Sequence, residues 1–156
     1  GFSRLSSIYV TLWDGQGKEV NRFFSPLNQA IDGVLVPVST QTDTMSWNVQ
    51  VGADRYPQFD CESHAESYSR LRNAQLIHQG SDSFSISSQQ YRTDKAIYAM
   101  NLEKCPGASS HTGINTRSGS QLSLNFKNLG AATTIHVVLH FECVVQCSAA
   151  GVEVLD

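Results

Sequence analysis

The sequence has few charged residues and no long apolar run, and these two absences exclude several classes of protein. Only 16% of its 156 residues are Asp, Glu, Lys or Arg, against about 25% in an average soluble domain. The densest basic cluster is Arg70-Leu71-Arg72, and the formal net charge is -3, so the chain lacks the basic patch typical of nucleic-acid binding. No stretch approaches the roughly 20 apolar residues of a transmembrane helix. We therefore expect neither a nucleic-acid partner nor a membrane span.

The four cysteines lack any recognisable motif. Cys61, Cys105, Cys143 and Cys147 contain no Cys-x-x-Cys pair and no zinc-ligand spacing. Cys143 and Cys147 lie four residues apart in an expected strand, which separates them by about 13 Å, too far for a disulfide. A Cys61–Cys105 bridge stays open, but nothing in the sequence favours it. We expect free thiols in a reducing compartment.

The sequence is rich in small hydroxyl residues, with 20 Ser and 9 Thr, which suit strands and turns better than exposed helices. Residues 5–13 alternate between two faces, and Asp14-Gly15 ends the run with a tight-turn signal. Residues 45–51 alternate in the same way and predict a half-buried strand. Further strands are expected at Glu19–Phe24, Val34–Val36, Phe84–Ile86, Ala96–Glu103, Leu122–Phe126, Thr133–Gln146 and Val152–Leu155.

One helix is expected over residues 60–79. Asp60 or Ser63 can cap it, and Ser63-x-x-Glu66 fits a capping box, while Gly80 marks the end. Helical spacing predicts a packed face that includes Ala65, Tyr68 and Leu71. We expect His64 and His78 to lie on the helix surface. Arg70 and Arg72 should form a solvated face or pack on their neighbours through their side-chain stems, and neither predicts an anion site.

Together these patterns predict an all-β fold, an antiparallel eight-stranded jelly-roll sandwich with one inserted helix (about 60–79). Residues 1–156 form a single domain by length, with no internal repeat. A chain of this length can bury a core large enough to fold without disulfide bonds or structural metals.

No arrangement of residues predicts catalysis or a bound metal. His136 and His140 share a strand, where two rings four residues apart lie about 13 Å apart, too far for one ion. His111 lies in a Ser-rich loop, but no Gly-x-Ser-x-Gly elbow accompanies it. Asp60 and Glu62 could pair as carboxylates, but they fall at an expected helix start, where negative charge is stabilised in any case. We therefore expect no catalytic residue, cofactor or metal.

A surface for other copies of the chain is a better expectation. Long loops at 25–43 and 103–119 contain no convergent titratable groups and suggest contact with a partner. The strand Thr133–Gln146 has a half-apolar face with little charge, and such faces are usually covered by another surface. The interface candidates on that face are His136, Val138, His140, Glu142 and Val144.

A family resemblance points the same way. The segments 113–130, His136-Val-Val-Leu-His-Phe-Glu142 and Gly151–Asp156 resemble the end of viral major capsid proteins of the double jelly-roll lineage, found in Polintons, Polinton-like viruses, adintoviruses and virophages. Tyr56-Pro-Gln-Phe and the helix through 69–75 are also similar to that group.

The resemblance implies a structural protein of the virion that assembles with copies of itself. It implies trimeric capsomers of an icosahedral shell, built of subunits with two jelly rolls each, and it implies no active site. The sequence departs from that pattern in length, because 156 residues hold one roll. The chain is then either the C-terminal roll of a longer protein, with a preceding roll as a partner, or a single-roll relative.

Two other functions stay open. The first is a jelly-roll binding module, lectin-like or of the trimeric C1q/TNF-like type, in which an exposed Trp13 or Trp47 would stack on sugars. Both tryptophans fit core positions better. The second is a cupin-type enzyme, which the His spacing disfavours because the His-x-His pattern of that class is missing.

Overall fold

The structure, a computed structural model, describes residues 4–14, 45–79, 85–93, 95–104, 112–117, 119–127, 133–148 and 151–155. Within these residues it has eight strands, all paired antiparallel, and two helices, so the expected all-β class is confirmed. The elements are β1 (Leu5–Asp14), β2 (Ser46–Val51), β3 (Asp54–Cys61), α1 (His64–Gln79), α2 (Ser88–Thr93), β4 (Tyr98–Asn101), β5 (Leu122–Lys127), β6 (Thr133–Phe141), β7 (Val144–Ser148) and β8 (Gly151–Leu155).

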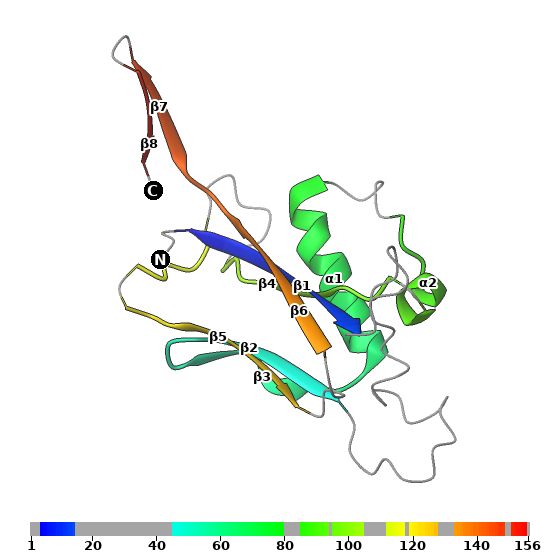
Figure 1. Cartoon of the computed structure of the whole chain (residues 1–156). Coiled ribbons are helices and arrows are strands. Elements are labelled where there is room, and N and C mark those ends of the chain that lie inside the picture. Colours follow the sequence, from blue (N-terminus) through cyan, green and yellow to red (C-terminus); the bar gives the residue numbers. More distant parts are fainter. Residues whose placement is uncertain are drawn as a thin grey trace, which may run out of the picture.

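The strands form two three-stranded sheets and a separate hairpin. One sheet has the order β4-β1-β6, the other has the order β3-β2-β5, and β7 pairs with β8. Figure 1 shows the two sheets as facing layers, with α1 beside the first and the β7–β8 hairpin standing away from both. The expected strands at Glu19–Phe24 and Val34–Val36 lie outside the described residues, as do Cys105 and His111.

The core lies between the two sheets and follows the alternation seen in the sequence. Ile8, Val10 and Leu12 of β1 are buried in it, as expected for side chains of period two. Leu5 is also buried there, because the register of β1 against β6 shifts between Leu5 and Ser7. The remaining large buried side chains come from β2, β4 and the residues next to them, namely Met45, Trp47, Val49, Val51, Tyr98, Met100 and Leu102.

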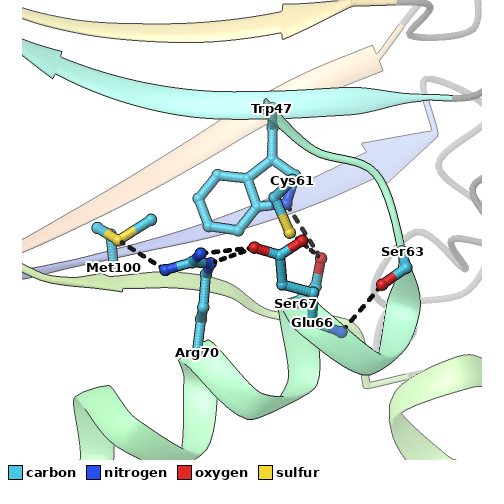
Figure 2. Close-up of polar contacts among 7 residues, drawn as sticks. All are labelled: Trp47, Cys61, Ser63, Glu66, Ser67, Arg70 and Met100. Carbon is cyan, nitrogen blue, oxygen red and sulfur yellow. Dashed lines mark hydrogen bonds and ion pairs between the residues drawn. The ribbon is translucent and has the colours of Figure 1, made fainter. Parts of the chain in front are cut away.

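The helix prediction is confirmed, but it begins later than Asp60. Asp60 is still part of β3, and Ser63 is the cap: the backbone N–H of Glu66 donates to Ser63 Oγ over 3.1 Å. Figure 2 shows this bond at the start of α1. Because Ser63 Oγ accepts a hydrogen bond from the first turn, Ser63 and not Asp60 marks the N-terminal end of α1.

The buried face of α1 differs from the predicted one. Leu71 is buried as expected, and Tyr68 is half-buried, its hydroxyl donating to the Ile86 carbonyl over 2.8 Å. Ala65, however, is exposed, whereas His64 and Ser67 are buried. The expectation of a surface position for His64 was therefore wrong, because polar residues occupy the buried stripe and periodicity of apolar residues alone does not reveal them.

Two further elements differ from the sequence expectation. The predicted strand at Phe84–Ile86 is not found in its described part, since residues 85–87 precede α2 without forming a strand. The strand β3 was missed because it contains Pro57 and several polar residues. Pro57 is tolerated because β3 is an edge strand of its sheet. Gly52, with a φ of 61°, makes the tight turn from β2 into β3.

Part of the long 103–119 segment lies against the start of β1. Leu5 and Ile114 exchange backbone hydrogen bonds of 3.0 and 2.9 Å. Gly113 lies so close that a Cβ there would approach the Leu5 carbonyl oxygen to 2.8 Å. This position therefore requires glycine for space.

Candidate assembly surface

The strand β6 places three of the five candidate residues on one face. In its register with β1, His136 lies opposite Thr11, Val138 opposite Tyr9 and His140 opposite Ser7. All three candidates are exposed, Val138 by 63%. Because directly opposite residues in an antiparallel pair point to the same side, these three residues form one continuous, weakly charged strip.

The other two candidates lie beyond a break in the strand. Instead of one strand over Thr133–Gln146, β6 ends at Phe141 and β7 begins at Val144. Glu142 lies in the link, half-buried, and its backbone N–H donates to the Arg4 carbonyl over 3.1 Å. Val144 opens the hairpin opposite Leu155, and its side chain lies outside the described part of the chain. The predicted single face therefore ends at His140.

Apolar side chains on the opposite side of β6 are also partly exposed to solvent. Ile135, Val137 and Phe141 are 41%, 43% and 40% exposed. They alternate with the candidate strip and lie on the core side, where Val137 is opposite Val10. Both sides of β6 thus present apolar side chains to solvent, an arrangement typical of a surface that another protein covers.

A buried serine anchors the candidate strip to β1. Ser6 is 1% exposed, and its Oγ lies 2.8 Å from His140 Nδ1 and 3.0 Å from the His140 carbonyl oxygen. This side-chain contact spans 134 residues of sequence. It fixes the imidazole of His140 beside Val138 on the outer face of β6.

A second polar cluster joins α1 to the sheets and is shown in Figure 2. The indole N–H of Trp47 donates to Ser67 Oγ over 3.1 Å, and Cys61 Sγ lies 3.3 Å from the same oxygen. Burial raises the pKa of the Cys61 thiol. A raised pKa favours the thiol over the reactive thiolate form.

The neighbouring charges of α1 form an intrahelical pair. Arg70 Nε donates to Glu66 Oε1 over 3.0 Å, and its Nη1 lies 3.9 Å from Met100 Sδ. Arg70 is half-buried, as the alternative of packing through its stem expects, while Arg72 is exposed. The cluster has the contacts of a structural joint between α1 and the sheets.

Asp60 is the centre of a third cluster, on the sheet β3-β2-β5. Its carboxylate accepts a hydrogen bond from Asn48 Nδ2 over 2.7 Å and one from Lys127 Nζ over 2.6 Å, and it also pairs with Arg55. The hydrogen bond from Lys127 is the largest cause of a lowered pKa of Asp60. The hydrogen bond from Asn48 and the positive charges of Lys127 and Arg55 lower this pKa further. Asp60 thus lies in β3 and not at the helix start expected for it, and Glu62 is exposed.

The remaining chemistry-bearing residues do not converge. Among the described residues, no group of three His, Cys, Asp or Glu side chains is placed to hold a metal ion. Cys61, Cys143 and Cys147 are free thiols. Neither helix in the described ranges has the length and apolarity needed to cross a bilayer.

Scans against protein-family models, curated proteins and solved structures find no match to this chain.

Proposed function

We propose that this chain is a structural capsid protein that assembles with copies of itself into trimeric capsomers of an icosahedral viral shell. It acts as a building unit of the virion and not as an enzyme, and it needs no cofactor. A preceding jelly roll, where the native protein has one, is its additional partner.

The observation that carries this proposal is the exposure of apolar side chains on both sides of β6. Val138 on one side is 63% exposed, and Val137 on the other is 43% exposed. The face of Val138 carries two histidines and no carboxylate or lysine within β6. A monomeric protein rarely leaves such a strand uncovered, whereas an assembling protein needs it.

The jelly-roll topology belongs to the same proposal. Two facing antiparallel sheets support it, as does the pairing of strands far apart in sequence, β1 with β6 and β2 with β5. The segments 113–130 and 136–142 resemble double jelly-roll capsid proteins. This resemblance supports trimeric capsomers of an icosahedral shell as the form of assembly.

Electron microscopy of the native source, combined with mass spectrometry of the purified particles, tests the proposal. We expect uniform icosahedral particles in which peptides of this chain are among the most abundant. Recovery of the chain only outside particles, as a monomer, would overturn the proposal.

A binding module is the second candidate, and one observation favours it. Phe59 on β3 is 84% exposed, and an exposed aromatic ring can stack on a sugar. Trp47 cannot serve in this way, because it is buried. Glycan-array binding that Phe59→Ala abolishes, by a protein that stays monomeric, would establish this second function in place of the first.

A further inference from the structure

We draw no further inference here: the strongest candidate, the set of apolar side chains that β6 and the β7–β8 hairpin expose, carries none, because nothing in the described part of the chain shows what covers either surface.

Discussion

The hydroxyl of Ser6 bonds two atoms of His140 at once, the imidazole Nδ1 at 2.8 Å and the carbonyl oxygen at 3.0 Å. A hydroxyl has one proton to donate. The carbonyl oxygen can only accept, so the Ser6 proton goes to it. Nδ1 must then donate to Ser6 Oγ, which means that Nδ1 carries a proton.

The first prediction concerns this proton. Two-dimensional ¹⁵N NMR of the imidazoles should show His140 protonated at Nδ1, either in the neutral Nδ1–H tautomer or in the imidazolium form. The neutral Nε2–H tautomer, the commoner form of free histidine, would contradict the bonding inferred for Ser6. Ser6→Ala removes the hydroxyl that accepts from Nδ1, so His140 should lose its preference for a proton at Nδ1; this variant is the control.

The second prediction concerns the joint between α1 and β2. Ser67→Ala removes the acceptor of the buried Trp47 indole N–H, so the free energy of unfolding should fall by about 1–3 kcal/mol. Ser69→Ala, at an exposed position of the same helix, makes the same change in helix propensity and should have no such cost. Urea unfolding of both variants measures the difference, and equal stabilities would contradict a structural role for the bond.

The third prediction is a pH dependence from Asp60. Its pKa is lowered in the folded protein, so its contribution to stability is present above the unfolded pKa of about 3.9 and is lost as the pH falls through the folded pKa. Asp60→Asn should therefore lower stability by about 1 kcal/mol near neutral pH. The difference should begin to shrink below about pH 4 and vanish only when the pH is below the lowered pKa of the folded protein.

Lys127→Met gives the check on that mechanism. Because the hydrogen bond from Lys127 is the largest cause of the lowered pKa, this variant should reduce the same acid-dependent difference. The double variant should cost less than the sum of the two single ones. Additive costs at neutral pH would show that the two groups act separately.

The fourth prediction concerns the packing of α1. Leu71 is fully buried, so Leu71→Ala should cost about 2–5 kcal/mol in denaturant unfolding. Arg72→Ala, at the exposed position beside it, should change stability by less than about 0.5 kcal/mol. A loss below 0.5 kcal/mol for Leu71→Ala would mean that the helix does not pack as described.

Local patterns predicted part of the regular elements. Strict alternation predicted β1, β2 and β5. The motif Ser63-x-x-Glu66 predicted the start of α1, and the other cap candidate, Asp60, proved to be part of β3. These signals act within a few residues, which is why they can be read without the fold.

The parts that the sequence did not predict depend on contacts between distant residues. Ser67 is buried because Trp47, 20 residues earlier, donates to it. The face of β6 with His136, Val138 and His140 followed from alternation, but the contact of His140 with Ser6 did not. The end of that face at His140 was also missed, since residues 142–146 continue the apolar alternation without a turn signal.

Light scattering coupled to size exclusion tests the central claim, self-assembly, most directly. At tens of micromolar the chain should elute with about three times the 17.1 kDa of one copy, or as a larger defined particle, and dilution should shift it toward smaller species. A well-behaved monomer at every concentration would contradict the account.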